Sequence, residues 1–344
     1  INSLDPGIQV VDAATRAEAA LALQDWTTVQ SALQAYIATP DAKAFMVQST
    51  LRQFTQVWEL DRDTRGTGPA LVNLLQARLL ARLETARRVV ILAGGGARRA
   101  GAEVARLAEA LDAPVVLTTN ARGLMHGHRL VVPASASLDS VRAVIAGADQ
   151  VLALGTEFGP TDYDMYVRGG LPDLKGMIRV DLCADQLKRH PCAVAIQGDA
   201  AAVAGWFADR VRVRQADGET RAASARAAAR AELAGLHPAM PRQLAMVEAI
   251  RDTLPGAIIV GDSTQPIYAA NLFYDHDRAG GWFNAATGYG ALGYGPGAAV
   301  GAAVAAPGVP VVCLVGDGGL QFSPGELRTA VDERLPITFI VWNN

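Results

Sequence analysis

Cysteine is scarce in this sequence, and neither sign of charge predominates. The 344 residues include three cysteines, Cys183, Cys192 and Cys313, whose spacing fits neither a zinc motif nor a disulfide framework. Against 31 basic residues stand 34 acidic ones, and the net charge of −3 predicts neither a nucleic-acid-binding surface nor an acidic tail. No signal peptide is recognisable at the start. We therefore expect a cytoplasmic protein that binds no nucleic acid.

A long stretch of the chain also lacks charge. Residues 283–316 contain no Asp, Glu, Lys or Arg, and a run of this length could cross a bilayer. The run is interrupted by many glycines and by Pro296, Pro307 and Pro310. It also ends in a strand-like apolar segment. These features favour the buried core of an α/β domain, and we expect no contact with a membrane.

What the sequence does contain is typical of a globular protein. Half of the residues are apolar and 19% are charged, and the length predicts about two domains. Residues 1–68 are expected to form a helical segment and a linker, because apolar residues recur at helical spacing until the charged stretch Asp61–Gly68. The start at Ile1 and the end directly after strand-like residues predict that the sequence is part of a longer chain.

Residues 69–213 alternate between helical and strand patterns, which predicts a central α/β domain. Uniformly apolar strands are typical of a parallel sheet covered on both faces. The expected strands are 89–94, 114–119, 150–155 and 177–182, and the expected helices are 70–87, 101–111, 138–147 and 200–209.

A second α/β domain is predicted over residues 240–344, after a linker helix over 214–239. The arginines of that helix are interspersed with Glu219 and Glu232, which favours a solvated helix over a nucleic-acid site. The expected strands of the second domain are 257–262, 309–317 and 337–344. The expected helices are 240–254, a small-residue helix after the glycine-rich stretch 287–301, and 325–334. The predicted fold class is thus α/β, with two doubly wound parallel-sheet domains and a helical N-terminal segment.

Two of these strands end in residues that suit a metal and a phosphate. Asp317 follows one strand and Asn344 ends the next, and a helix between them makes the strands parallel. Carboxylate and amide oxygens are suitable ligands for Mg²⁺, which also binds substrate phosphates. Gly318 and Gly319 allow the backbone to approach an anion closely. We therefore predict a site for a metal-bound phosphate compound at this edge of the sheet.

The same residues resemble a known signature. Gly316–Gly318, followed after residues 319–342 by Asn343 and Asn344, is similar to the motif of thiamine diphosphate-dependent enzymes. The segments VGDSTQ (260–265) and TGYGALGYGPGAAVGAA (287–303) resemble the family's diphosphate-side loop and cofactor segment. Within the family, the acetolactate synthase and 2-oxo acid decarboxylase group is the most similar. The resemblance implies a central domain followed by a thiamine diphosphate-binding domain.

The resemblance also implies roles for single residues. Asp317 and Asn344 would bind Mg²⁺, and Gly318 and Gly319 would bind diphosphate through backbone N–H groups. Gln265 occupies the place of a polar diphosphate contact. Leu292 would be the bulky residue that holds the cofactor bent, and Gly290, with Tyr289 or Ala291 beside it, would contact the pyrimidine through the backbone.

The resemblance implies an enzyme that decarboxylates or joins 2-oxo acids, and a homo-oligomer, either a dimer or a tetramer. The stretches TDYDMY (161–166) and STQ (263–265) resemble the 5-guanidino-2-oxopentanoate (2-ketoarginine) decarboxylase branch more than acetolactate synthases. No glutamate of this chain matches the family's activating glutamate, which is expected from a pyrimidine-binding domain, often of another subunit. The alternatives are a non-catalytic or regulatory subunit and a nucleotide-binding α/β module.

Weaker motifs concern the central domain. The glycine turn after the first strand, Gly94–Gly96, resembles a dinucleotide loop, but its spacing differs from G-x-G-x-x-G. A structural turn is favoured over bound FAD or NAD. Glu157, Asp162 and Asp164 could form a cation-binding or inter-subunit cluster, although a solvated loop is favoured. His126 and His128 could bind a metal, but we expect them to lie in a loop without one.

Overall fold

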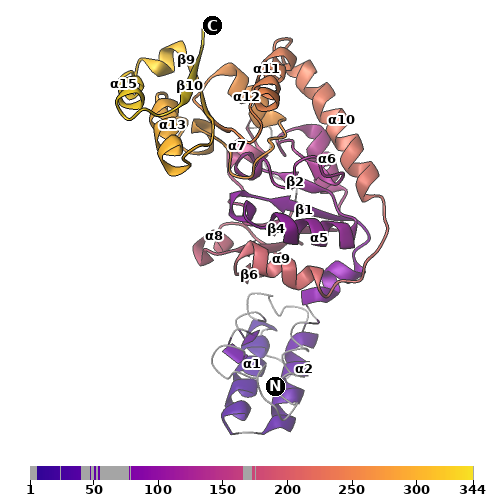
Figure 1. The fold of residues 1–344 in the computed structure, drawn as a ribbon. Helices are drawn as coiled ribbons and strands as arrows, with labels where there is room; N and C mark the ends of the chain where they lie inside the picture. Colours follow the sequence, from indigo (N-terminus) through magenta and orange to yellow (C-terminus); the bar gives the residue numbers. More distant parts are fainter. Residues whose placement is uncertain are drawn as a thin grey trace.

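The computed structural model describes residues 6–23, 25–39, 79–165 and 176–343, together with a few single positions between 47 and 77 and residues 173–174. A pair of helices, a six-stranded sheet and a four-stranded sheet follow one another along the chain (Figure 1). The predicted linker over 61–68 lies outside the described residues.

The N-terminal helices α1 (Pro6–Ala22) and α2 (Trp26–Ala38) pack against each other. Asp25 begins α2, and its carboxylate accepts a hydrogen bond from the backbone N–H of Thr28 at 3.1 Å. Leu21, Leu33 and Tyr36 are buried between the helices. The predicted helical character of this segment is confirmed, and Figure 1 shows the pair apart from both sheets.

The central sheet is entirely parallel, with the strand order β3-β2-β1-β4-β5-β6. This is the order of doubly wound dinucleotide-binding folds, in which the chain reverses direction between β1 and β4. The strands are β1 (Val89–Ala93), β2 (Val115–Leu117), β3 (Val131–Val132), β4 (Gln150–Leu154), β5 (Ile178–Asp181) and β6 (Val194–Gln197). Strands β3 and β6 were not predicted, because each is a short edge strand with too few residues to show a pattern.

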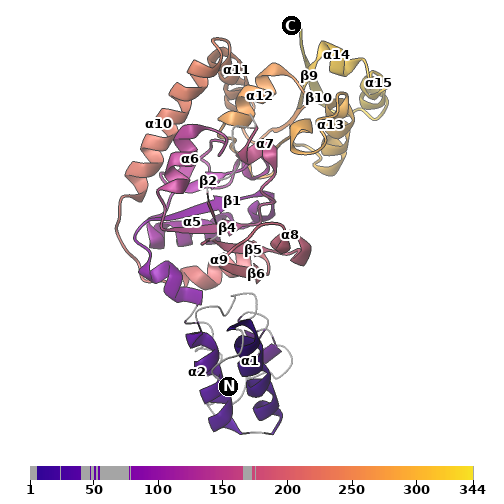
Figure 2. The same cartoon turned by 180° about the vertical axis from the view of Figure 1, so that it is seen from behind.

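Helices cover both faces of this sheet. On one face α5 (Gly101–Leu111) and α9 (Ala200–Ala208) bury their apolar sides, and on the other face lie α6 (Asp139–Ala146) and α10 (Gly218–Leu236). Shorter elements are η3 (Gly95–Ala97), η4 (Thr119–Ala121), α7 (Pro160–Tyr163) and α8 (Ala184–Lys188). Both views show α10 along the outside of the central sheet (Figures 1 and 2). Its alanines and Leu233 are buried there, so the predicted linker helix is also a packing element.

The second sheet is also parallel, with the order β10-β9-β7-β8. Its strands are β7 (Ile258–Gly261), β8 (Trp282–Asn284), β9 (Val311–Gly316) and β10 (Ile337–Trp342). Its helices are α11 (Met240–Thr253), α12 (Gln265–Leu272), η5 (Ala285–Thr287), α13 (Tyr294–Ala305), α14 (Asp317–Leu320) and α15 (Gly325–Asp332). The predicted fold class is confirmed. The short strand β8 was missed, since three residues carry no periodicity.

The charge-free stretch 283–316 forms the end of β8, η5, α13 and β9. Alternate residues of β7 and β9 pack under α13 in one core, while the others join a core that continues into the central sheet. None of the helices in the described part of the chain has both the length and the apolar character needed to cross a membrane.

Buried polar contacts join the two sheets. The guanidinium of Arg122, after η4, donates hydrogen bonds to the backbone oxygens of Tyr274 at 3.0 Å and Asn271 at 3.1 Å. Arg122 is completely buried, and burial lowers its pKa to about 10. Because desolvating this cation is costly, these hydrogen bonds hold the central domain and the α12 region in one relative position.

His276 lies between α12 and β8 and is buried against Ala257, the residue before β7. The carbonyl oxygen of Ala257 can only accept, so His276 Nε2 donates to it at 3.0 Å, and Nδ1 accepts from the Tyr274 hydroxyl at 2.9 Å. The second contact requires the neutral ring, because a protonated Nδ1 cannot accept a hydrogen bond. Burial lowers the pKa of His276 from 6.5 to about 4.

A pH dependence of stability follows from this histidine. Between pH 6.5 and 4 the unfolded chain binds a proton at this ring and the folded chain does not, so stability falls as the pH decreases. We expect the wild type to lose about 3 kcal/mol more than His276→Gln between pH 7 and pH 4. Urea unfolding of both proteins at these pH values measures the difference, and parallel losses would contradict the assignment.

Candidate functional site

The carboxyl ends of β7 and β9 lie side by side in the second sheet. The register pairs Gly261 with Leu314, and the backbone N–H of Asp262 continues the ladder to the Leu314 oxygen at 2.9 Å. The chain order reverses here, because β7 is flanked by β8 on one side and by β9 on the other. Open α/β sheets bind ligands at such a position.

Asp317 lies at this edge. It follows β9 directly and begins α14, and its side chain is exposed. Its carboxylate makes no hydrogen bond or ion pair with any residue that the structure describes. Trp342 of β10 pairs with Gly316, so Asn343 leaves the sheet at the level of Asp317. Asn344, the second predicted metal ligand, lies outside the described residues.

The two glycines after Asp317 differ in their surroundings. A Cβ atom on Gly318 would meet nothing within 4 Å, so its exposed backbone is open to a ligand. Gly319 is buried, and a Cβ there would lie 3.0 Å from Oδ1 of Asp262. Gly319 is therefore required by packing against Asp262, in addition to any contact with an anion.

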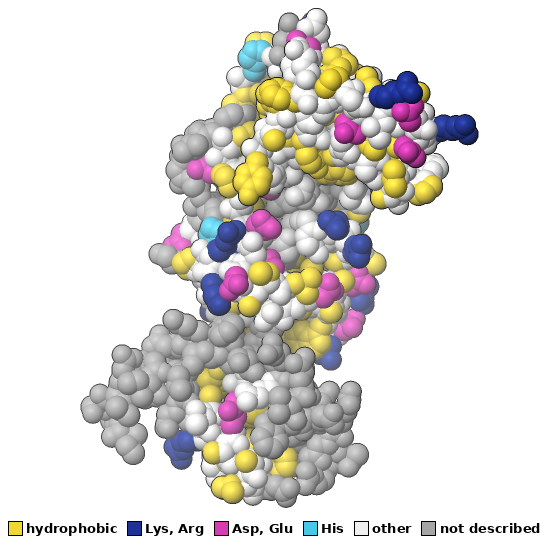
Figure 3. Space-filling model, turned by 90° about the vertical axis from the view of Figure 1, so that its left-hand side faces the viewer, with side chains coloured by type: hydrophobic (Ala, Val, Ile, Leu, Met, Phe, Trp, Pro, Cys, Tyr) yellow, Lys and Arg dark blue, Asp and Glu magenta, His cyan; other side chains and the backbone are white. Residues whose placement is uncertain are grey.

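The turn that carries Leu292 lies between η5 and α13. Gly290 and Gly293 have positive φ angles, +68° and +84°, which glycine adopts without strain. The side chains on the turn are exposed: Tyr289 fully, and Leu292 by 48%. Ala291 is exposed as well. Figure 3 shows hydrophobic side chains gathered over the upper part of the molecule, where the second sheet lies.

Three side chains hold the backbone of this turn, and the sequence analysis assigned a role to none of them. The hydroxyl of Ser263 donates to the Gly290 oxygen at 3.1 Å, and that of Ser323 donates to the Gly293 oxygen at 2.8 Å. The buried carboxylate of Asp262 accepts from the backbone N–H of Gly295 at 2.8 Å. Asp262 and Ser263 lie within the VGDSTQ motif, in which a residue role was predicted only for Gln265.

Gln265 is exposed at the start of α12. Its side-chain oxygen accepts a hydrogen bond from the Gln243 amide at 3.0 Å, so that oxygen already has a partner within the chain. The neighbouring Thr264 is buried, and its hydroxyl has no partner among the described residues. This hydroxyl faces Gly316, where a Cβ would lie 3.5 Å away. Thr264 is a polar group at the edge that the sequence analysis missed.

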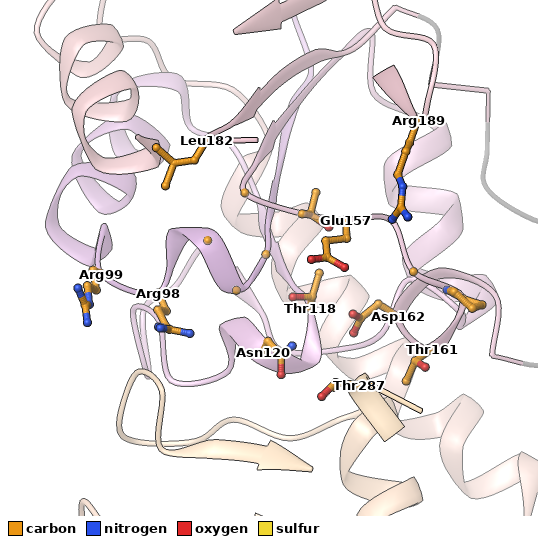
Figure 4. Close-up of a pocket in the computed structure, with 18 of the residues that line it drawn as sticks. Arg98, Arg99, Thr118, Asn120, Glu157, Thr161, Asp162, Leu182, Arg189 and Thr287 are labelled. Atoms are coloured by element: carbon orange, nitrogen blue, oxygen red, sulfur yellow. The ribbon is translucent and has the colours of Figure 1, made fainter. Parts of the chain in front are cut away.

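A separate cavity of about 800 Å³ lies at the reversal point of the central sheet, between the ends of β1 and β4 (Figure 4). Figure 4 shows Arg98 and Arg99 at one side of it and Arg189 at the other. Thr287, Gly288 and Tyr289 of the second domain also line it, so the cavity reaches the turn that carries Leu292.

Close packing of the backbone explains why glycines line this cavity. A Cβ on Gly94 would lie 2.2 Å from the Gly155 oxygen, and one on Gly96 would lie 2.9 Å from the Gly155 Cα. The turns after β1 and β4 are thus packed backbone against backbone. This packing requires glycine whether or not a nucleotide binds.

The three acidic residues after β4 do not form one cluster. Asp162 accepts from the Thr119 N–H at 2.7 Å, and burial raises its pKa although this hydrogen bond opposes the shift. Asp164 forms an ion pair with Arg142 at 2.7 Å. Glu157 is exposed and lines the cavity. The cation-binding alternative is therefore not supported by their placement.

His126 and His128 also bind to different partners. His126 pairs with Asp275 at 2.9 Å, and His128 pairs with Glu109 at 3.1 Å. Within the described ranges, no three His, Cys, Asp or Glu side chains come together as a metal site.

Comparison with known proteins identifies the domains that contain the two sheets. Residues 76–205 match the central domain of the thiamine pyrophosphate enzymes, and residues 261–344 match their C-terminal TPP binding domain. Thiamine pyrophosphate is another name for thiamine diphosphate.

Several characterised or named proteins are similar over most of this chain. The probable 2-ketoarginine decarboxylase AruI of Pseudomonas aeruginosa is 38% identical over 269 residues, which are 76% of this chain and 47% of that protein. An acetolactate synthase of Mycobacterium bovis is 29% identical over 290 residues, 78% of this chain and 45% of the relative. A sulfoacetaldehyde acetyltransferase of Castellaniella defragrans is 30% identical over 327 residues, 81% and 52% of the two chains.

The chain spans about half the length of the curated relatives that it matches. The matched ranges include the strand ends, the glycine turn and Asp317 described above. The resemblance predicted from the sequence is confirmed, and the chain belongs to the thiamine pyrophosphate enzyme family, with a central domain and a cofactor-binding C-terminal domain.

Proposed function

We propose that this chain is the central and cofactor-binding part of a thiamine diphosphate- and Mg²⁺-dependent enzyme that acts on 2-oxo acids. The observation that carries the proposal is the position of Asp317 at the reversal point of a sheet matched to the family's cofactor domain, where its carboxylate has no partner among the described residues. The division into a helical segment, a central domain over 69–213 and a cofactor domain over 240–344 is part of this proposal.

The residues at this edge fit a diphosphate and a metal ion. The buried Thr264 hydroxyl lacks a partner among the described residues, and a diphosphate oxygen would provide one. Gly318 has open space above its backbone, which an anion can approach. Asp317 would bind Mg²⁺ together with Asn344, and Gly318 and Gly319 would donate backbone N–H groups to the diphosphate. Gln265 would contact the diphosphate only if its side chain gave up the hydrogen bond to Gln243.

The turn after η5 fits the other end of the cofactor. Leu292 presents an exposed apolar side chain at the same edge, and Gly290 and Ala291 are exposed beside it. The backbone N–H of Gly290 already donates to the Ala285 oxygen, and its oxygen accepts from Ser263. We propose that Leu292 supports the bent cofactor and that the backbone of Gly290 and Ala291 contacts the pyrimidine. When bound, thiamine diphosphate supplies a carbon nucleophile and an electron-accepting ring for decarboxylation of the 2-oxo acid. The activating glutamate would come from another part of the protein or from another subunit.

An oligomer is also part of the proposal. Tyr289, Leu292, Tyr294 and Phe322 are large apolar side chains on one domain, and each is at least 40% exposed. Clustered apolar surface of this kind is typical of sites that another molecule covers. We propose that a second copy of the protein covers it in a dimer or tetramer.

The substrate proposal rests on similarity. The relative named as a probable 2-ketoarginine decarboxylase is 38% identical, while the acetolactate synthase of Mycobacterium bovis is 29% identical. We propose that this protein decarboxylates a cationic 2-oxo acid such as 2-ketoarginine and forms acetolactate slowly.

The metal site is tested with Asp317→Ala. Without this carboxylate the diphosphate charge is less well compensated, and we expect the affinity for thiamine diphosphate with Mg²⁺ to fall at least about a hundredfold. Isothermal titration of the complete protein, with and without Mg²⁺, measures the effect. Asp332→Ala removes an equal charge from an exposed ion pair in α15 and serves as the control. Unchanged affinity in Asp317→Ala would refute the assignment.

Leu292 is tested by separating turnover from binding. Leu292→Ala should lower kcat by about tenfold or more, because the cofactor loses its apolar support, while the cofactor affinity changes less. Leu292→Met keeps the bulk and should retain most of the activity. The role is wrong if Leu292→Ala shifts only the KM for the 2-oxo acid.

The substrate class is tested by steady-state assays of the complete enzyme with pyruvate and 2-ketoarginine. We expect kcat/KM to be at least about tenfold higher for the cationic substrate, because a guanidinium must be paired with carboxylates in a dry site. A preference for pyruvate with acetolactate as the product would move the protein to the acetolactate synthase branch and leave the cofactor assignment intact.

A further inference from the structure

The turn between η5 and α13 has little packing of its own to hold it. Its residues from Gly288 to Leu292 are exposed, and Gly290 and Gly293 have positive φ angles. Glycine has more backbone freedom to lose on ordering than other residues. A turn of this composition needs contacts from outside to keep one conformation.

Within the same segment, the backbone N–H groups of Gly288 and Gly290 donate to the Ala285 oxygen at 3.1 and 2.9 Å. The contacts from outside come from three side chains on two other segments. At one end of the turn, the Ser263 hydroxyl donates to the Gly290 oxygen at 3.1 Å. In the middle, the Ser323 hydroxyl donates to the Gly293 oxygen at 2.8 Å. At the other end, the Asp262 carboxylate accepts from the Gly295 N–H at 2.8 Å.

Asp262 is suited to anchor the turn. It is completely buried, and its second oxygen accepts from the Ser263 N–H at 2.7 Å. Gly295 is in the first turn of α13, where a negative charge is stabilised by the helix dipole and by free N–H groups. A buried carboxylate held by backbone N–H groups cannot move without leaving them unpaired.

Ser323 connects the turn to the segment that begins with Asp317. It follows α14, and a Cβ on Gly293 would lie 2.6 Å from the Cβ of the neighbouring Phe322. The two segments therefore touch at this glycine. Displacement of one would disturb the other.

We propose that Asp262, Ser263 and Ser323 are positioning residues, a three-point clamp that fixes the turn carrying Leu292 relative to the ends of β7 and β9. The inference rests on the proposed function, in which Leu292 supports the cofactor. The clamp links the proposed diphosphate side and the proposed pyrimidine side of the site. The clamp keeps Leu292 in place before the cofactor binds, so less conformational entropy is lost on binding.

The two serines provide the sharper test, because both are only partly buried and their truncation leaves the core intact. In the complete apo protein, Ser263→Ala and Ser323→Ala should each speed hydrogen exchange of the amides in 288–295 by about fivefold, the effect of one hydrogen bond. Thr329→Ala removes a hydroxyl-to-carbonyl hydrogen bond within α15 and should leave this segment unchanged.

Function provides the second readout. Either alanine variant should weaken thiamine diphosphate binding by about fivefold and lower kcat, with the KM for the 2-oxo acid unchanged. Ser263→Thr and Ser323→Thr retain the hydroxyl and should restore both values. The clamp is refuted if exchange in 288–295 is the same in wild type and alanine variants, or if it rises equally throughout the domain. A wild-type protein that binds no thiamine diphosphate would instead refute the proposed function, and the exchange data would still decide whether the clamp exists.

Discussion

The parallel pairing of β7 with β9 is the constraint on which the rest of the cofactor domain depends. The end of β7 and the start of β9 are separated by 49 residues (262–310), yet their carboxyl ends are adjacent because Ile258 pairs with Val311. The pairing places Asp262 beside the turn Gly316–Gly319 and beside the start of α13. Without it, Asp317 and Leu292 would lie on unrelated loops. A shift of this register by one residue would exchange the side chains that face the α13 core with those that face the core shared with the central sheet, so the packing of both cores fixes the register.

Buried polar groups extend this order beyond the sheet. Asp262 connects the end of β7 to the start of α13. One of its oxygens accepts from the Ser263 N–H and the other from the Gly295 N–H. Arg122 has a similar role between domains, where its guanidinium holds carbonyl groups at the end of α12. In both cases a charged group out of water is stable only while its partners stay in place, so each rigidifies its surroundings. The apolar core that runs through both sheets supplies the remaining rigidity.

Several functional expectations could be read from local sequence because they depend on residues close together in the chain. Strand, glycine turn and carboxylate are contiguous in 311–319, so the position of Asp317 at a strand end was predictable. The acidic residues after β4 show the opposite case. Glu157, Asp162 and Asp164 are neighbours in sequence, but Asp162 bonds to Thr119 and Asp164 to Arg142. Their partners lie on other elements, and sequence proximity therefore suggested a cluster that the fold does not form.

By itself, the sequence determined the fold class, most of the strands and helices, and the family. It could do so because apolar periodicity and short glycine motifs are local properties of the chain. Only the tertiary structure decided the edge strands β3, β6 and β8, the packing role of α10, and the contacts of Ser263 and Ser323 with the turn that carries Leu292. Each of these depends on pairing between distant segments. A serine hydroxyl bonded to a remote carbonyl leaves no periodic pattern, because its partner is chosen by the folding of the whole domain.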